Sequence, residues 1–438
     1  MLRHRLSHLE KYFDFFIAKP YNWENHADAE LSVLSTEKNM ERRDFIRNSL
    51  LSFSLLPGTN LIGEILQQSE KRVAASGGKR RRLRELGIRI GSLEPGPYNA
   101  ITDVEGIRVG QTTIIKGQGR GAVRTGVTVI LPHADNIYEE NLFASCFIQN
   151  GWGEMTGIAA LENTGLLKTP VFLSGTYNVG IVLSAATKYL CEMNPEMGDK
   201  AEMAHPVVAE CFDDFLSDTK SRQITEADVV KAIESARSGA VAEGAVGGGT
   251  GMTSFGFKGG IGTSSRRTKN HNTVGVLVMA NTAGRNQLRI DGVPVGKEIV
   301  GFGEKAGKTK SIILLAATDA PLLPFQLRKI GKRVAMGLAQ TGAISSTGSG
   351  DIILAFSTAN RIPRARQTDF HSLKGVNDLS ITPLYEATVE ATQEAILNAL
   401  CMAETTVGRD GNTSYGLPVD QVEEIMKKHG RIGAKIHG

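Results

Sequence analysis

The sequence has few of the residues that cross-link a small fold or bind a metal. It contains four cysteines in 438 residues with no Cys-x-x-Cys pair, and its nine histidines form neither a His-Glu-x-x-His nor a His-x-His pattern. A zinc site and a disulfide framework are therefore disfavoured, and we expect no metal or organic cofactor. Unpaired cysteines are usually interior, so we predict buried thiols at Cys146, Cys191, Cys211 and Cys401.

An excess of charge of one sign is also missing. Lys and Arg number 50 against 46 Asp and Glu, which gives a formal net charge of +4. Residues 1–90 contain 16 of the basic and 11 of the acidic side chains, so the rest of the chain is close to neutral. A nucleic-acid partner would need a basic stripe to neutralise phosphates. We therefore expect no nucleic-acid partner.

Long apolar runs are absent as well. The apolar stretch at 50–66 is interrupted by proline, glycine, asparagine and glutamate. A helix that spans a bilayer needs about 20 apolar residues in succession, so we expect no membrane span.

The segment MERRDFIR resembles a twin-arginine export signal, because Arg42 and Arg43 stand just before this apolar stretch. Small residues at 73–75 would suit cleavage of such a signal. We predict that translation starts at Met40, that residues 1–78 lie outside the fold, and that the mature protein is exported to a periplasm-like compartment. The alternative for this region is an amphipathic helix with a linker, and the protein is then cytoplasmic.

Residues 79–438 are predicted to form a single domain of layered strands and helices. With 41% hydrophobic residues the chain can bury a large core, and its 49 glycines indicate many tight turns. Continuous apolar runs rich in Val and Ile predict strands covered on both faces at 126–132, 169–175, 273–281, 311–319 and 351–358. Apolar residues at three- and four-residue spacing predict helices at 180–194, 225–237, 323–342 and 383–402. The pattern is typical of a layered α/β or α+β domain.

Residues 244–262 contain nine glycines and could be mistaken for a nucleotide-binding loop. A phosphate loop needs a strand before it and a helix after it, together with a Lys-Ser/Thr pair or a distant acid. The apolar run at 273–281 follows instead. We predict a structural glycine loop that lines a site.

Serines are the remaining candidates for chemistry. The sequence has no G-x-S-x-G elbow, and His205 is expected to pack or cap rather than to catalyse. Ser311 opens one apolar run, and Ser349 and Asp351 lead into the next. A hydroxyl becomes a good nucleophile only when a base takes its proton. In N-terminal-nucleophile enzymes that base is the α-amine of the same residue, with a pKa near 7.7–8.0, and the amine exists only after the chain is cut.

Several sequence blocks carry a specific resemblance. They are GPYNAITDVEGIRVGQTTI, RTGVTVILP, NGWGEMTG, PVVAE, GGGTGM, FKGGIGTSSR, GVPVG, ATDAPLLP and GSGDIILAFST. Together they resemble the L-aminopeptidase/D-esterase and β-peptidyl aminopeptidase family of self-cleaving serine hydrolases, from about Leu83 to Gly411.

The resemblance implies an α+β fold, a four-layer αββα sandwich similar to that of N-terminal-nucleophile hydrolases but differently connected. It also implies self-cleavage between Lys310 and Ser311 into an α chain, 79–310, and a β chain, 311–438, and assembly into homo-oligomers, tetramers or larger. The family commonly has Gly or Asn at the position of Lys310 and often Glu at that of Asp351. Gly262–Thr263 is an alternative scissile bond.

By the same resemblance Ser311 is the nucleophile and Ser349 and Asp351 assist it. Asn281 matches the oxyanion-binding asparagine, and Glu210 the carboxylate that holds the substrate ammonium. Relatives often have a tyrosine two residues after that glutamate, where this chain has Phe212, and Tyr177 is a weaker substitute donor.

The function that this implies is release of N-terminal residues from short peptides, amides or esters through an acyl-enzyme. One alternative is acyl transfer to an amine on the same fold. The other is an uncleaved binding protein without catalysis.

Overall fold

The structure is a computed structural model that describes residues 79–302, 310–365 and 369–432. The predicted extension 1–78, with its export signal and the start at Met40, lies outside the described residues. The export signal and the start at Met40 therefore stay predictions. Within the described residues no helix is both long and apolar enough to cross a membrane.

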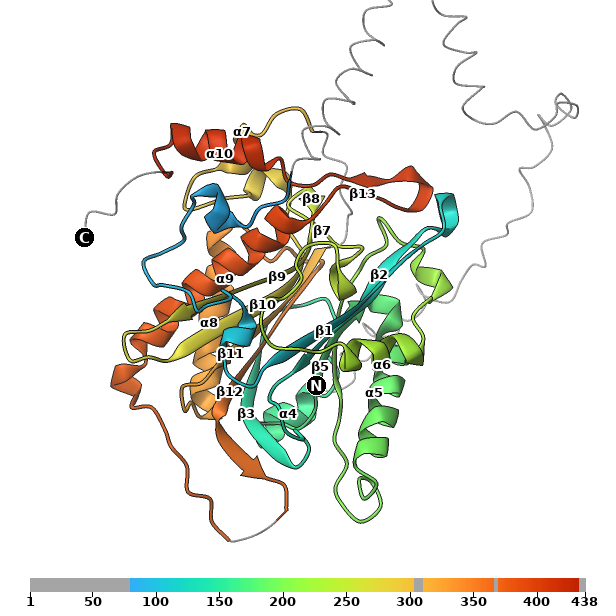
Figure 1. The fold of residues 1–438 in the computed structure, drawn as a ribbon, viewed down its shortest axis with the longest axis vertical. Helices are drawn as coiled ribbons and strands as arrows, with labels where there is room; N and C mark the ends of the chain where they lie inside the picture. Colours follow the sequence, from blue (N-terminus) through green and yellow to red (C-terminus); the bar gives the residue numbers. More distant parts are fainter. Residues whose placement is uncertain (1–78, 303–309, 366–368, 433–438) are drawn as a thin grey trace, which may run out of the picture. The chain divides into compact units, whose positions relative to one another are not determined.

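Two sheets form the centre of the fold (Figure 1). The larger has the strand order β4-β3-β12-β11-β10-β9. Its strands are β3 (Glu140–Gly151), β4 (Leu166–Leu167), β9 (Gly260–Arg267), β10 (Thr273–Asn281), β11 (Lys310–Thr318) and β12 (Ser349–Pro363). The smaller has the order β1-β2-β5-β6, with strands β1 (Arg108–Lys116), β2 (Val123–Leu131), β5 (Val171–Gly175) and β6 (Val207–Cys211). Two short hairpins complete the strands: β7 (Thr253–Ser254) with β8 (Phe257–Lys258), and β13 (Thr406–Val407) with β14 (Thr413–Ser414).

Helices cover the outer face of each sheet. Figure 1 shows α8 (Pro324–Gln340) and α9 (Thr382–Met402) on the larger sheet, and α5 (Val179–Met193) and α6 (Glu226–Glu234) on the smaller one. Shorter helices are α4 (Ile158–Thr164), α7 (Val295–Glu298) and α10 (Val419–Lys428). The order of layers is helix, sheet, sheet, helix. The predicted α+β, four-layer αββα sandwich is therefore confirmed.

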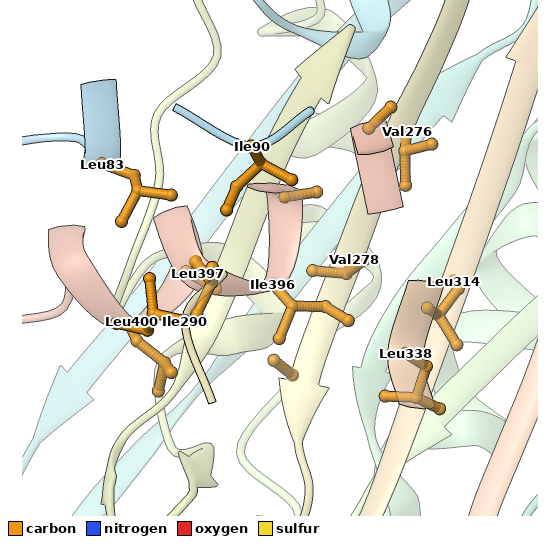
Figure 2. Packing of buried hydrophobic residues seen from close by; sticks show 14 of the residues in the cluster. Leu83, Ile90, Val276, Val278, Ile290, Leu314, Leu338, Ile396, Leu397 and Leu400 are labelled. Carbon is orange, nitrogen blue, oxygen red and sulfur yellow. The ribbon is translucent and has the colours of Figure 1, made fainter. Parts of the chain in front are cut away.

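Three clusters of buried apolar residues lie between the four layers. One lies between α8, α9 and the larger sheet, one between the two sheets, and one between the smaller sheet and α5 and α6. Figure 2 shows part of the first, where Val278 of β10 and Leu314 of β11 lie near Ile396 of α9 and Leu338 of α8. Burial of this much apolar surface is the main force that holds such layers.

Strand β11 shows why the sequence predicted a strand covered on both faces. Its even-numbered residues from Ile312 to Ala316 belong to the helix-side cluster, and its odd-numbered residues from Ile313 to Ala317 belong to the inter-sheet cluster. Side chains alternate between the faces of a strand, so a strand with apolar neighbours on both sides is apolar throughout.

Other predictions need correction. Helix α6 ends at Glu234 rather than 237, because Ser235 caps it and a turn follows. Strands β7 and β8 lie within the glycine-rich segment 244–262 and β9 begins in it, and their short or polar sequences gave no strand signal. Three of the cysteines are buried as predicted, but Cys191 is exposed, because it lies on the solvent side of α5.

Candidate active site

Ser311 lies at the start of β11, with the end of β10 on one side and the start of β12 on the other. In the ladder it pairs with Asn281, the last residue of β10, and with Gly350, near the start of β12. Alternation along β11 puts its side chain on the inter-sheet face with Ile313. The side chain is buried, with the residue 2% exposed. Three strand ends therefore bring these residues together.

The hydroxyl of Ser311 lies against the peptide bond that precedes it. Its Oγ donates to the carbonyl oxygen of Lys310 at 2.6 Å and accepts a hydrogen bond from the backbone N–H of Gly350 at 3.2 Å. Alternation places the Lys310 side chain on the other face of the sheet, where burial lowers the pKa of its amine. The side chains of Lys310 and Ser311 therefore point to opposite faces of the sheet.

Ser349 and Asp351 flank the same peptide bond from β12. Ser349 pairs with Lys310 in the ladder, and its hydroxyl donates to Asp351 Oδ1 at 2.6 Å. Asp351 Oδ2 is buried and has no hydrogen-bond partner among the described residues. Burial raises the pKa of Asp351, and the nearby hydroxyls of Ser345 and Ser349 oppose this shift. In the ladder the two residues lie opposite Lys310 and Ile312, the neighbours of Ser311, and alternation puts their side chains on the helix side of the sheet.

The amide of Asn281 is fixed by hydrogen bonds at both ends. Its Oδ1 accepts from the backbone N–H of Thr253 at 2.8 Å, and its Nδ2 donates to the carbonyl oxygen of Phe212 at 3.0 Å. A primary amide has two N–H bonds, so one N–H is left for a further acceptor on the inter-sheet face that Asn281 shares with Ser311.

Glu210 is a buried carboxylate on β6 in the facing sheet. Its Oε1 accepts from the backbone N–H of Glu154 at 3.0 Å, and its Oε2 accepts from the hydroxyl of Thr176. Burial raises the pKa of Glu210, and these two hydrogen bonds oppose the shift. Gly153 packs between Glu210 and Gly350, the residue that pairs with Ser311 in the ladder. A Cβ added to Gly153 would lie 3.2 Å from Glu210 Oε1 and 3.1 Å from Gly350 Cα.

The structure therefore places Asn281, Ser349 and Asp351 at the strand ends next to Ser311 in the larger sheet, with Ser311 and Asn281 on the inter-sheet face, and it places Glu210 near the end of β6 in the facing sheet. Sequence reasoning missed the backbone donors of Gly350, Thr253 and Glu154, because main-chain groups leave no signal of residue type. The blocks NGWGEMTG, GGGTGM and GSGD that contain or adjoin them were the available signal.

Tyr177, His205 and the bond between Gly262 and Thr263 were the remaining candidates from the sequence. The ring of Tyr177 packs edge-on against Phe212 at 5.5 Å between centroids, with the tyrosine 48% exposed. His205 lines a cavity of about 270 Å³ beside α4. The alternative scissile bond Gly262–Thr263 stays a prediction; both residues are buried and paired in the middle of β9, whereas Lys310 and Ser311 lie at the start of β11.

Comparisons with known proteins agree with this arrangement. The model of Peptidase family S58 matches residues 99–414. The chain is 39% identical over 376 residues to the β-peptidyl aminopeptidase BapA of Sphingosinicella microcystinivorans, an overlap of 81% of this chain and 93% of that protein.

Two solved structures extend the likeness. A β-aminopeptidase of Burkholderia sp. has a TM-score of 0.76 at 38% identity, covering 81% of this chain and 100% of that one. The L-aminopeptidase D-Ala-esterase/amidase of Ochrobactrum anthropi, described as a new variant of the Ntn hydrolase fold, has a TM-score of 0.74 at 36% identity, covering 80% and 99%. The chain therefore belongs to peptidase family S58 and is a peptide hydrolase.

Proposed function

We propose that this chain is a self-processing serine aminopeptidase or amidase in which Ser311 first releases its own amine and then acts as the nucleophile. The observation that supports this best is the 2.6 Å contact of Ser311 Oγ with the carbonyl oxygen of Lys310. Cleavage at this bond would give an α chain ending at Lys310 and a β chain of 311–438.

The cleavage step needs only the groups at this edge and water. Ser311 Oγ bonds to the carbonyl carbon of Lys310, and the hydroxyl proton passes to the Ser311 nitrogen as the C–N bond breaks. Water then hydrolyses the resulting ester, which leaves a carboxylate on Lys310 and a free amine on Ser311. The Gly350 N–H, already bonded to Oγ, holds the hydroxyl in place before the attack.

The released amine then serves as the base for substrate hydrolysis. It takes the Oγ proton while Oγ attacks the substrate carbonyl, and it returns the proton to the leaving amine or alcohol. The remaining N–H of Asn281 is placed to bind the oxyanion that forms. Water resolves the acyl-enzyme.

Ser349 and Asp351 are proposed to stabilise the protonated amine of Ser311. They lie beside the peptide bond whose nitrogen becomes that amine, and the buried Asp351 Oδ2 lacks a partner among the described residues. An ammonium there would supply the missing donor and a compensating charge. In this role the acid acts on the amine, and Ser349 orients the acid.

The substrates are proposed to be short peptides, amides or esters with a free amino terminus. The solved and curated relatives are named for β-peptidyl, L-aminopeptidase and D-Ala-esterase/amidase activities. Glu210 is the proposed partner of the substrate ammonium, because it is a buried carboxylate in the facing sheet and Gly153 packs between its Oε1 and Gly350, which pairs with Ser311 in the ladder. No cofactor is needed for this chemistry.

A denaturing gel with N-terminal sequencing tests the proposal. We expect two fragments, the smaller beginning Ser-Ile-Ile-Leu, and hydrolysis of β-alanyl, L-alanyl or D-alanyl amides by the cleaved material. A single full-length band in a preparation that hydrolyses these amides would overturn the mechanism, since Ser311 would then have no free amine.

Export and assembly are proposed as well. The twin-arginine signal would direct the mature chain to a periplasm-like compartment, and Arg42→Lys together with Arg43→Lys should retain it in the cytoplasm. The processed αβ units are proposed to form a tetramer or a larger homo-oligomer. Light scattering coupled to gel filtration would give a monomeric αβ mass if this is wrong.

A further inference from the structure

Lys258 is a fully buried lysine that the mechanism above does not use. It lies in β8 with no exposed surface, and its Nζ donates to three main-chain carbonyl oxygens: Met252 at 2.7 Å, Gly259 at 2.8 Å and Gly249 at 3.1 Å. An ammonium has three protons, so these acceptors use all of them. The lysine therefore binds the glycine loop on both sides of the β7–β8 hairpin.

This hairpin holds the amide of Asn281. Lys258 pairs in the β7–β8 ladder with Thr253, the residue whose backbone N–H donates to Asn281 Oδ1. The hairpin also bonds the next residue of the chain after Asn281, because Phe255 N–H and the Ser254 hydroxyl both donate to the carbonyl oxygen of Thr282. The position of Thr253 N–H therefore depends on the loop that the ammonium closes.

A buried charge of the opposite sign lies behind the other anchor of the amide. Asn281 Nδ2 donates to the carbonyl oxygen of Phe212, and Asp213 follows directly, 2% exposed. Burial lowers the pKa of Lys258 to about 7, and the Asp213 carboxylate opposes this. The amide is thus clamped between two segments, each with a buried ionisable group, and the two groups attract each other when charged.

We propose that Lys258 is a positioning residue for the oxyanion-binding amide of Asn281. The inference rests on the proposed function, in which that amide stabilises the oxyanion. With the ammonium in place, Thr253 N–H holds Oδ1 and the free N–H of Nδ2 faces the reacting carbon. Without it, the loop relaxes and Thr253 N–H no longer fixes Oδ1, so that the amide is held only through Phe212 and its free N–H is no longer fixed in direction.

A double-mutant cycle on the processed enzyme, which contains both the α and the β chain, tests this role. Lys258→Met removes the ammonium with little change of volume, and Asn281→Ala removes the amide. Each should lower kcat by about 10²- to 10³-fold, the effect of losing one oxyanion donor, with KM nearly unchanged. The double variant should be no slower than Asn281→Ala alone, because Lys258 acts only through the amide. The acylation burst counts active Ser311, so misfolded or uncleaved molecules do not enter kcat.

Arg266→Met is the matched control for loss of a buried cation. Arg266 is also fully buried but bonds Glu390 and Glu394 in the helix layer, away from Asn281. It should lower stability and leave kcat per titrated serine within about twofold. Lys258→Gln, which keeps two donors, is the milder second variant and should give an intermediate kcat with the same lack of additivity.

Two results would overturn the proposal: wild-type kcat in either Lys258 variant, or a double variant slower than Asn281→Ala by the full factor of Lys258→Met. The proposed function fails separately. If the wild-type enzyme carries no Ser-Ile-Ile-Leu terminus, the reaction itself is wrong whatever Lys258 does.

Discussion

Two regions of the molecule, the layer between α9 and the larger sheet and the surroundings of Ser311, treat buried charge in opposite ways. On the helix side, Arg266 bonds Glu390 at 2.9 Å and Glu394 at 2.7 Å, and Arg84 also reaches Glu394 at 3.0 Å. Burial alone would raise the pKa of Glu394, but the two arginines outweigh it and hold the pKa below its usual value. The acids on this side are compensated.

Around Ser311, no cation of the described residues forms an ion pair with the buried acids. Burial raises the pKa of Glu210, Asp213 and Asp351, with that of Asp213 reaching about 7. An oxygen of Asp213 and one of Asp351 lack hydrogen-bond partners among the described residues. A buried acid that is paired with an arginine belongs to the scaffold. A buried acid without an ion-pair partner is a candidate to bind a charged ligand or a group that the reaction releases. The comparison distinguishes scaffold from site.

Ser311→Ala gives the largest expected effect, because it removes the hydroxyl that is the proposed nucleophile. We expect a single uncleaved chain and hydrolysis at background level, since alanine can neither attack the Lys310 carbonyl nor form an acyl-enzyme. The gel and an amide-hydrolysis assay measure both. Ser346→Ala, a nearby serine outside the proposed machinery, is the control and should be cleaved as the wild type is. Cleaved Ser311→Ala protein would contradict the assignment.

Arg266→Met breaks the compensated side. It leaves two buried carboxylates without their main partner, so the free energy of unfolding should fall by about 3–5 kcal/mol. Chemical denaturation in the Ser311→Ala background measures this on one uncleaved chain. Arg89→Met removes an exposed partner of Glu94 and should change it by less than about 1 kcal/mol. Equal losses in the two variants would remove the distinction between compensated and surface charge.

Much of this fold could be predicted from the sequence. The runs at 273–281 and 311–319 correspond to β10 and β11 almost residue for residue, since strands covered on both faces are apolar throughout. Strand β9 was missed because its sequence, GIGTSSRR, is polar although it is buried: Ser264 donates to a carbonyl of α9 and Arg266 is neutralised by two acids. Periodicity cannot reveal polar residues whose partners lie far along the chain.

The candidate site divides in the same way. Side chains such as Ser311 and Asn281 could be named from motif blocks, and the structure places them side by side in the ladder. The Gly350 N–H and the main-chain acceptors of Lys258 could not, because every residue has such groups and only the fold aims them. The packing of Gly153 between Glu210 and Gly350 is likewise a property of tertiary structure.

Glu210→Gln tests the inter-sheet edge through substrate binding. The ionised carboxylate would hold the substrate ammonium, so the variant should raise KM by roughly 10- to 100-fold, the value of one hydrogen bond between charged groups, with a smaller change in kcat. Because burial raises the pKa of Glu210, the wild-type KM should begin to rise, as pH falls, at a higher pH than for an exposed glutamate.

Initial rates across pH measure this, with Glu154→Gln as the control. The Glu154 side chain is exposed, and its main-chain N–H and carbonyl oxygen both bond Glu210. Its charge makes a smaller contribution to the raised pKa of Glu210, so this variant should keep the wild-type KM at neutral pH and move the low-pH rise of KM slightly to lower pH. A KM for Glu210→Gln that still rises at low pH, as in the wild type, would show that another group binds the ammonium.

Asp351→Asn should give the smallest effect and one of opposite sign to that of Arg266→Met. The raised pKa of Asp351 means that its ionised form makes the folded protein less stable at neutral pH. The protonated carboxyl contributes stability that is fully present below its ordinary pKa and is lost as pH rises through the raised pKa. In the uncleaved Ser311→Ala background, asparagine should therefore raise the free energy of unfolding at neutral pH by roughly 1 kcal/mol or less, and the gain should vanish in acid. Denaturation at two pH values measures it. A loss of stability at neutral pH would mean that the charge of Asp351 is already compensated before cleavage, and the distinction between the two regions would then fail at the residue beside the scissile bond.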